Sequence, residues 1–360
     1  MNNCRFRVLH TIHSLASGGA ERQLLLLCRL SATAPFEMAV FYVKDAGVDV
    51  SKIDMTFYRS ATSNRFNIGI FPSLHRAIKN FKPHVIHTWL PASVTIPTMA
   101  LARLHHRPCL FSYRNAMSFH GMLTRIEFGL AWLSADRIVA NNPVSQSARA
   151  YQRLFARKRG VVIPNAVFVD PKYRKGPREG ERSTRLEILF VGRLSSQKNW
   201  SCLIRAVGLL PPATPWHLTV CGDGEERDEM ATMVESLGQA KRVSMLGYQQ
   251  NIYLVMQKAD VLVLPSLYEG MPNVLLEALA LGVPCIVSDI AAHRFIDGGG
   301  KCVRMFNPMD PAELAECLVD VFNCPELSID MVKAGIDVAK DFAPELMIKR
   351  YVALYESMIM

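Results

Sequence analysis

Two glutamates with seven residues between them are the side chains of this chain best suited to binding a polar ligand. Glu269 lies in a loop after the apolar segment Val261–Leu264, and Glu277 lies inside the helix predicted over Asn273–Leu281. A carboxylate on the loop and another about one turn into the helix can accept hydrogen bonds from different hydroxyl groups of one ligand. The helix N-terminus and the amide of Gly270 favour a phosphate. The spacing therefore predicts a site for a small molecule with hydroxyl and phosphate groups.

A structural role is the alternative for these carboxylates, with Glu269 exposed and Glu277 complementing the positive end of the helix. Because the residues around Glu277 in that helix are Val, Leu and Ala, an incidental position there is disfavoured. Paired glutamates also act as acid and nucleophile in glycoside hydrolases. The hydrolase interpretation gives no role to the cations of a nearby loop.

Two cations, Arg193 and Lys198, lie five positions apart in the loop after the apolar segment Leu186–Val191. Arginine presents a fork of donors and lysine a point charge, so the pair can converge on a single diphosphate. Two solvated loop cations are the alternative. Together with the glutamates, the cations favour a ligand that carries a diphosphate as well as hydroxyl groups.

Glycines occupy two further junctions between a predicted strand and a predicted helix. Gly18 and Gly19 lie in the first, and residues 221–224, Cys-Gly-Asp-Gly, form the second. A glycine lets the backbone approach a ligand closely, and the free N–H groups at a helix start favour anions. A tight turn without a ligand is equally compatible with the first junction, and capping of the following helix is the alternative role for Asp223.

Neither a metal site nor a disulfide framework is predicted. The chain has no D-x-D motif, and none of the histidines considered has a ligand spacing with carboxylates; these are His84, His87, His105, His106 and His120. The nine cysteines are an odd number without a C-x-x-C pair, and most lie in apolar segments. They are therefore expected to be reduced thiols of the core, as in a cytoplasmic protein.

The elements that position these residues form two α/β series. Short β-rich segments alternate with predicted helices of about 10–15 residues, which is typical of a doubly wound parallel sheet. The pattern predicts two Rossmann-like domains, residues 1–168 and 185–342, joined by a linker at 169–184. A C-terminal helix over 343–360 is expected to cross back to the first domain. Ligands of such folds bind at the carboxyl ends of the strands, so a cleft between the two sheets is the expected site.

The two halves of the chain differ in charge. Residues 1–180 contain 25 Lys and Arg against 9 Asp and Glu, whereas residues 181–360 contain 16 against 23. A basic half indicates an anionic partner, such as acidic lipid headgroups or a phosphorylated substrate. Nucleic acid is disfavoured, because the cations are scattered and no aromatic-interleaved motif accompanies them.

Two amphipathic segments of the basic half are candidates for contact with an anionic membrane surface. The first contains the cations and apolar residues Arg65, Phe66, Ile68, Ile70, Phe71, Arg76, Lys79, Phe81 and Lys82. The second is the predicted helix at 122–133, with Arg125. Packing of both segments into the core, with a basic edge left in water, is the alternative.

As a set, these motifs resemble those of the retaining glycosyltransferases of family 4, which have the GT-B fold. Glu269 and Glu277 are similar to the E-x7-E motif of that family. The other motifs follow in the family's order: Gly18-Gly19-Ala20-Glu21-Arg22, Asn165 after an apolar strand, Gly192-Arg193 with Lys198, Gly222-Asp223-Gly224, and residues 259–266. The resemblance covers almost the whole chain and is strongest over residues 186–288.

The resemblance implies a role for each matching residue. The implied donor site consists of Gly18, Gly19, Arg193, Lys198, Tyr248, Glu269, Gly270, Met271, Asn273, Val274 and Glu277. Arg193 and Lys198 would bind the donor diphosphate and stabilise the departing nucleoside diphosphate. Glu277 would accept hydrogen bonds from the ribose and Glu269 from the transferred sugar, so Glu269, Arg193 and Lys198 are the expected catalytic residues. No protein general base is assigned, and no metal is required.

The acceptor side departs from the family pattern. Many relatives carry a histidine at the end of the strand before the acceptor loop, whereas this strand ends in Tyr113-Arg114-Asn115. Either Arg114 replaces the histidine or His120 supplies it from the following loop. Arg114, Asn115 and His120 are therefore the acceptor-site candidates.

The expected activity is transfer of a hexose or N-acetylhexosamine from a nucleoside-diphosphate sugar, with a UDP-sugar as the expected donor. A lipid-linked saccharide of surface polysaccharide, lipopolysaccharide or capsule synthesis is the expected acceptor, and the inner face of the cell membrane the expected location. A GT-B-type sugar-nucleotide epimerase and a basic nucleic-acid binder are the alternatives. Dependence of diphosphate release on an acceptor discriminates among the three.

Overall fold

The computed structural model describes residues 6–15, 18–44, 50, 53–61, 69–90, 92–114, 122–143, 157, 160–174 and 184–360. The chain divides into two compact units: Met1–Ala166 together with Pro344–Met360, and Val167–Ala343. Each unit contains one sheet whose strands all pair in parallel, and α-helices lie between most successive strands. The prediction of two Rossmann-like parallel-sheet domains is therefore confirmed.

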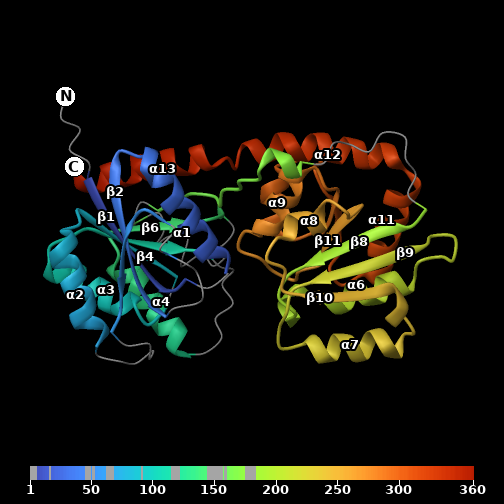
Figure 1. Ribbon diagram of the computed structural model, residues 1–360, viewed down its shortest axis with the longest axis horizontal. Helices are drawn as coiled ribbons and strands as arrows, with labels where there is room; N and C mark the ends of the chain where they lie inside the picture. Colours follow the sequence, from blue (N-terminus) through green and yellow to red (C-terminus); the bar gives the residue numbers. More distant parts are fainter. Residues whose placement is uncertain are drawn as a thin grey trace. The chain divides into compact units, whose positions relative to one another are not determined.

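The first unit contains a seven-stranded sheet in the order β3-β2-β1-β4-β5-β6-β7. Figure 1 labels β1, β2, β4 and β6 of this sheet. Its strands are β1 (Phe6–Ser14), β2 (Phe36–Lys44), β3 (Thr56–Arg59), β4 (Val85–Trp89), β5 (Cys109–Tyr113), β6 (Arg137–Ala140) and β7 (Val161–Val162). Its helices are α1 (Gly19–Leu30), α2 (Ile70–Phe81), α3 (Thr95–Leu104), α4 (Met122–Ser134) and the C-terminal α13 (Pro344–Ile359). Helices α1 and α13 cover one face of the sheet, and α2, α3 and α4 cover the other.

The second unit contains a six-stranded sheet in the order β10-β9-β8-β11-β12-β13. Its strands are β8 (Leu186–Val191), β9 (Trp216–Cys221), β10 (Val243–Gly247), β11 (Val261–Leu264), β12 (Cys285–Ser288) and β13 (Arg304–Phe306). Its α-helices are α6 (Trp200–Gly208), α7 (Arg227–Ser236), α8 (Ile252–Met256), α9 (Asn273–Leu281), α10 (Ala291–Asp297), α11 (Pro311–Asn323) and α12 (Pro325–Lys340). Because β8 and β11 are neighbours, the loops that follow them lie side by side at one edge.

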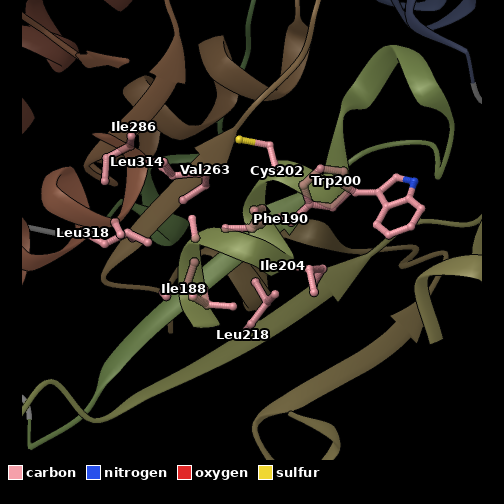
Figure 2. Packing of buried hydrophobic residues seen from close by; sticks show 14 of the residues in the cluster. Ile188, Phe190, Trp200, Cys202, Ile204, Leu218, Val263, Ile286, Leu314 and Leu318 are labelled. Atoms are coloured by element: carbon pink, nitrogen blue, oxygen red, sulfur yellow. The ribbon is translucent and has the colours of Figure 1, made fainter. Parts of the chain in front are cut away.

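Both faces of the second sheet are buried, which explains why its strands are almost continuously apolar. Along β8, Ile188 and Phe190 face a cluster formed with α6, α7 and α11, whereas Leu189 faces a cluster formed with α8, α9 and α12. Figure 2 shows the first cluster, in which Trp200 and Ile204 of α6 pack beside these strand residues. Helices therefore pack on both faces of the strands that lead to the site.

Residues predicted to be linker partly belong to the second unit. Pro171–Tyr173 form a short 3-10 turn, and Gln257 next to α8 donates a hydrogen bond to the Tyr173 carbonyl at 3.0 Å. The second unit begins at Val167, whose N–H donates to the Phe342 carbonyl at 2.9 Å. The sequence also predicts a helix over residues 144–155, which lie outside the described residues.

The structure corrects one of the two proposed membrane segments. Ile70 and Phe81 of α2 are buried in the core, and Phe71 is half-buried against it, whereas Arg76 and Lys79 are exposed to water. The amphipathic pattern of α2 is thus explained by core packing. Residues 62–68 lie outside the described part. Among the helices that the structure describes, none is both long and apolar enough to cross a membrane.

Helix α4 keeps apolar side chains on its surface. Ile126, Leu130 and Leu133 are 49%, 44% and 62% exposed, and their spacing places them along one side of the helix. Leu104, at the end of α3, is 65% exposed. Arg103 of α3 donates to the Ser134 carbonyl at 3.3 Å, which places the ends of the two helices side by side. The second predicted segment therefore presents an apolar surface to water, next to a cation.

Candidate functional site

The loops after β8 and β11 are held together by hydrogen bonds. Gln197 donates from its side chain to the Tyr268 carbonyl and accepts from the Leu267 N–H, both at 2.9 Å. Asn199 adopts a left-handed conformation with φ of 50°. Its amide donates to the Pro265 carbonyl at 3.0 Å and so adds a third connection between the loops. These contacts bring the cation-bearing loop to the loop that carries Glu269.

Lys198 and Glu269 form a largely buried ion pair. The Lys198 ammonium donates to Oε1 of Glu269, and the two side chains are only 16% and 9% exposed. The Ser266 hydroxyl donates to the same oxygen at 2.8 Å. A side chain on Gly192 would meet the methylene groups of Lys198 at 3.4 Å, so the lysine stem lies along the glycine backbone. Two residues predicted for one ligand are thus in direct contact.

The ion pair keeps Glu269 ionised. Burial raises the pKa of the Glu269 carboxyl, but the Lys198 ammonium and the hydrogen bonds from Lys198 and Ser266 outweigh that effect. The pKa is therefore lowered from its ordinary value of 4.5. A buried carboxylate that is held in one orientation and charged at neutral pH is suited to accept hydrogen bonds from hydroxyl groups.

Helix α9 carries Glu277 and starts at the end of the same loop. Pro272 is its N-cap residue, and its carbonyl accepts from the Leu275 N–H at 3.2 Å. Glu277 is buried, as are Gly270 and Met271 in the loop. The buried position of this glutamate in an apolar helix fits a ligand-binding role better than the role of a solvent-exposed carboxylate. Asn273 and Val274, in the first turn of α9, are half-buried.

Arg193 lies differently from Lys198. Its guanidinium pairs with Glu225 at 2.9 Å, and its side chain is 72% exposed. The structure therefore brings Lys198, but not Arg193, into contact with Glu269. Tyr248, the expected neighbour of the base, follows β10 and is 59% exposed.

The glycines after β9 serve the backbone of a neighbouring loop. Gly222 has φ of +139°, and a Cβ there would lie 1.8 Å from the Gly192 carbonyl oxygen. A Cβ on Gly224 would lie 2.2 Å from the Leu194 carbonyl oxygen. These glycines therefore permit close approach of the loop after β8, a role that requires no ligand. Asp223 accepts from the Gly224 N–H at 2.9 Å and caps the turn rather than the following helix.

In the first unit, Gly18 is the N-cap of α1 and Gly19 its first residue. The Glu21 carboxyl folds back onto Gly18, where a Cβ would lie 2.2 Å from Oε2 of Glu21. Burial raises the pKa of Glu21. The glycine at position 18 thus makes room for a carboxyl group at the start of the helix.

Arg114 is buried in the first unit and fixed by neutral partners. It donates to Oδ1 of Asn165 at 2.6 Å and to the Tyr351 hydroxyl of α13, and it lies 4.4 Å above the Trp89 ring. These contacts tie the end of β5 to α13. The other acceptor candidates, Asn115 and His120, lie outside the described residues.

Three residues near Glu269 were not expected from the sequence: Ser266, Ser288 and His293. Ser266 and His293 come shortly after strand ends, and Ser288 is the last residue of β12. Serines and histidines at such positions are common, so the sequence offers no distinguishing signal. Their proximity depends on the register between β11 and β12, which pairs Leu264 with Val287. Among the residues that the structure describes, no group of three or more His, Cys, Asp or Glu is arranged to hold a metal ion.

Comparisons with known proteins agree with this architecture. The family described as Glycosyl transferases group 1 matches residues 173–338, and Glycosyltransferase Family 4 matches residues 17–170. The lipopolysaccharide core biosynthesis glycosyltransferase LpsE of Rhizobium meliloti is 24% identical, with 98% of this chain and 99% of the relative covered. A Campylobacter jejuni α-1,4-N-acetyl-D-galactosaminyltransferase, named for an undecaprenol-diphosphate-linked saccharide, is 26% identical over 93% and 94% of the two chains.

Solved structures show the same fold. The Anabaena protein HepE in complex with UDP-glucose superposes with a TM-score of 0.81 at 18% identity, covering 98% of this chain and 100% of that chain. The lipopolysaccharide outer core galactosyltransferase WaaB gives a TM-score of 0.70 at 17% identity, covering 97% and 99%. At such identities these likenesses concern the fold, which is GT-B.

Proposed function

Since the chain belongs to the group 1 glycosyl transferases of glycosyltransferase family 4, we propose that it transfers a hexose or N-acetylhexosamine from a nucleoside-diphosphate sugar to a lipid-linked saccharide. Relatives named for undecaprenol-diphosphate-linked acceptors support this acceptor class. One of them is named for UDP-galactose, which supports a UDP-sugar as donor. The product would enter a surface polysaccharide, lipopolysaccharide or capsule.

The observation that carries this proposal is the buried contact between Lys198 and Glu269. A sugar and the diphosphate attached to it are adjacent in the donor, so the residues that bind them must also be adjacent. Glu269 accepts hydrogen bonds from the sugar hydroxyls, and Lys198 offers its remaining donors to the diphosphate. Glu277, in helix α9, accepts hydrogen bonds from the ribose hydroxyls.

The reaction replaces the bond between the anomeric carbon and the diphosphate by a bond to an acceptor hydroxyl. The transition state has oxocarbenium character, and negative charge grows on the leaving diphosphate. A preorganised cation stabilises that charge without reorganisation. Lys198 supplies this cation. Arg193 supplies a second one after its ion pair with Glu225 opens. We propose that the anomeric configuration is retained, with a donor phosphate oxygen taking the acceptor proton, and that no metal is required.

The test is acceptor-dependent release of nucleoside diphosphate from a panel of UDP- and GDP-sugars mixed with lipid-linked saccharides. Release only in the presence of acceptor, unchanged by EDTA, supports the proposal. An α-linked product from an α-configured donor, identified by NMR, supports retention. Conversion of the donor to an isomer without acceptor indicates an epimerase. Tight binding of nucleic acid without turnover indicates a non-enzymatic nucleic-acid binder.

We also propose that the first unit docks on an anionic membrane, such as the inner face of the cell membrane, through the exposed residues Leu104, Ile126, Leu130 and Leu133 beside Arg103. Apolar side chains can enter the headgroup region while cations attract anionic lipids. The acceptor carries a lipid, so a docked enzyme would meet it at the bilayer surface.

Replacing both Leu130 and Leu133 with serine is expected to weaken binding to anionic vesicles about tenfold or more, because each leucine buries apolar area on docking. Binding of the wild type should weaken as salt rises. Sedimentation with vesicles measures both effects. Replacement of Leu237 and Leu246, which are 49% and 47% exposed in the second unit, is the matched control. Equal wild-type binding to neutral and anionic vesicles would refute the docking.

A further inference from the structure

His293 is a buried histidine close to the donor site. It is the third residue of α10, which follows β12, and its side chain is fully buried. Nδ1 lies 2.7 Å from the Ser288 carbonyl oxygen. Because a carbonyl oxygen only accepts, Nδ1 must carry the proton and donate. This contact fixes both the orientation of the ring and its tautomer.

A chain of hydrogen bonds leads from His293 to Glu269. His293 holds the carbonyl of Ser288, and the Ser288 hydroxyl donates to the Ser266 carbonyl in the next loop. The Ser266 hydroxyl in turn donates to Oε1 of Glu269 at 2.8 Å. The orientation of the Glu269 carboxylate therefore depends on residues from two neighbouring strand ends.

The surroundings keep the imidazole neutral. Burial lowers the pKa of His293, and the nearby Lys198 ammonium lowers it further. The Ser288 carbonyl and the carboxylates of Glu269 and Asp289 act in the opposite direction but do not outweigh burial. Asp289 is itself paired with Arg294. His293 is thus a neutral donor beside the Lys198–Glu269 pair and not a third charge in it.

The other ring nitrogen forms no hydrogen bond that would explain why a histidine stands here. Within the part of the chain that the structure describes, Nε2 of His293 is buried without a hydrogen-bond partner. A buried acceptor left unsatisfied costs free energy, so the ring as a whole is not optimised for stability. The Nδ1 contact to Ser288 is the interaction that connects His293 with the site.

We propose that His293 is a positioning residue for the donor sugar, which acts through Ser288 and Ser266 to hold the Glu269 carboxylate in place. This rests on the proposed function, in which Glu269 binds the transferred sugar. His293 itself does not contact the substrate. Losing its Nδ1 donor is therefore expected to weaken recognition of the sugar and to leave recognition of the nucleotide unchanged.

Two replacements separate the ring nitrogens. In His293→Asn the amide NH2 lies where Nδ1 was, whereas in His293→Gln the amide extends to the place of Nε2. We expect His293→Gln to raise the donor KM about tenfold, the effect of one lost hydrogen bond. The donor KM of His293→Asn should stay within about threefold of the wild-type value, a smaller change than the loss of one hydrogen bond causes. Affinity for free UDP or GDP should be the same in all three proteins. Ala291→Ser, at an exposed position of α10, is the control.

The opposite order, with His293→Gln active and His293→Asn impaired, would show that Nε2 contacts the ligand and would overturn the proposal. Equal losses of thermal stability and activity in both variants would overturn it in favour of a packing role. Nitrogen-15 NMR of the intact protein gives a readout that does not depend on activity. A neutral ring protonated at Nδ1 at pH 7 is expected, and a charged or Nε2-protonated ring would refute the inference. Absence of turnover in the wild type would instead count against the proposed function.

Discussion

Replacing Lys198 with methionine is expected to remove most of the sugar transfer and to destabilise the protein. Methionine keeps an apolar stem over Gly192 but leaves the buried Glu269 carboxylate without its ion partner. We expect kcat/KM to fall by about 10²–10³-fold, as when a preorganised charge is removed from an active site. Unfolding in urea should show a loss of about 3 kcal/mol at neutral pH, because breaking a buried pair strands one charge.

In Lys198→Met, the contribution of Glu269 to the unfolding free energy should change with pH in the opposite direction to that in the wild type. In the wild type the pKa of Glu269 is lowered from 4.5, so its ionised form contributes stability above that pH. That contribution is lost as the pH falls through the lowered pKa. Without Lys198, burial dominates and raises the pKa of Glu269, so protonation at mildly acidic pH relieves the buried charge. The difference in unfolding free energy between the two proteins should therefore shrink as the pH falls.

Two further variants control this experiment. Lys198→Met combined with Glu269→Gln removes both charges, and it should recover stability without recovering transfer. Lys258→Met removes an exposed lysine of the same unit and should change neither quantity. Wild-type kcat/KM in Lys198→Met would contradict the assignment of the cation to the leaving diphosphate.

Replacing Glu277 with glutamine is expected to weaken binding of the nucleotide itself. Two charged hydrogen bonds to ribose hydroxyls would be lost, and kcat/KM for the donor should fall by about 100-fold. Because the ribose belongs to the nucleoside diphosphate, the Kd for free UDP or GDP should rise in parallel. Isothermal titration and steady-state kinetics measure the two effects.

Glu269→Gln provides the comparison for Glu277, since Glu269 is assigned to the sugar. Its replacement should lower kcat/KM without changing the Kd for free nucleoside diphosphate. Glu229→Gln, an exposed glutamate in the first turn of α7, is the neutral control. If Glu277→Gln binds nucleotide as tightly as the wild type, the ribose assignment is wrong.

The convergence of Lys198 and Glu269 could be anticipated from the sequence in outline. Strands that alternate with helices imply parallel sheets, and the ends of parallel strands meet at one edge. Direct contact between the two side chains depends also on β8 lying next to β11, and this strand order cannot be derived from periodicity. The apolar strands of the second unit gave strong signals because both of their faces are buried.

Other features depended on contacts that only the fold reveals. The five-residue spacing predicts that Arg193 and Lys198 bind the same diphosphate. In the structure, however, Arg193 forms an ion pair with Glu225 from the next strand–helix junction. Gly222 looked suited to a ligand, whereas the carbonyl of Gly192 fills the space beside it. The apolar residues of α2 suggested a membrane contact because one sequence cannot distinguish a lipid-facing stripe from a core-facing one. The edge strands β3 and β13 contain few fully buried residues, so the sequence has no clear apolar pattern there that predicts a strand.

A crystal structure of the protein with a UDP- or GDP-sugar would test the central claim most directly. The claim is that one donor molecule occupies the carboxyl edge of the second sheet. The predicted result places the diphosphate against the Lys198 ammonium, the sugar hydroxyls against Glu269 and the ribose against Glu277. A donor bound elsewhere, with all three side chains out of its reach, would contradict the account.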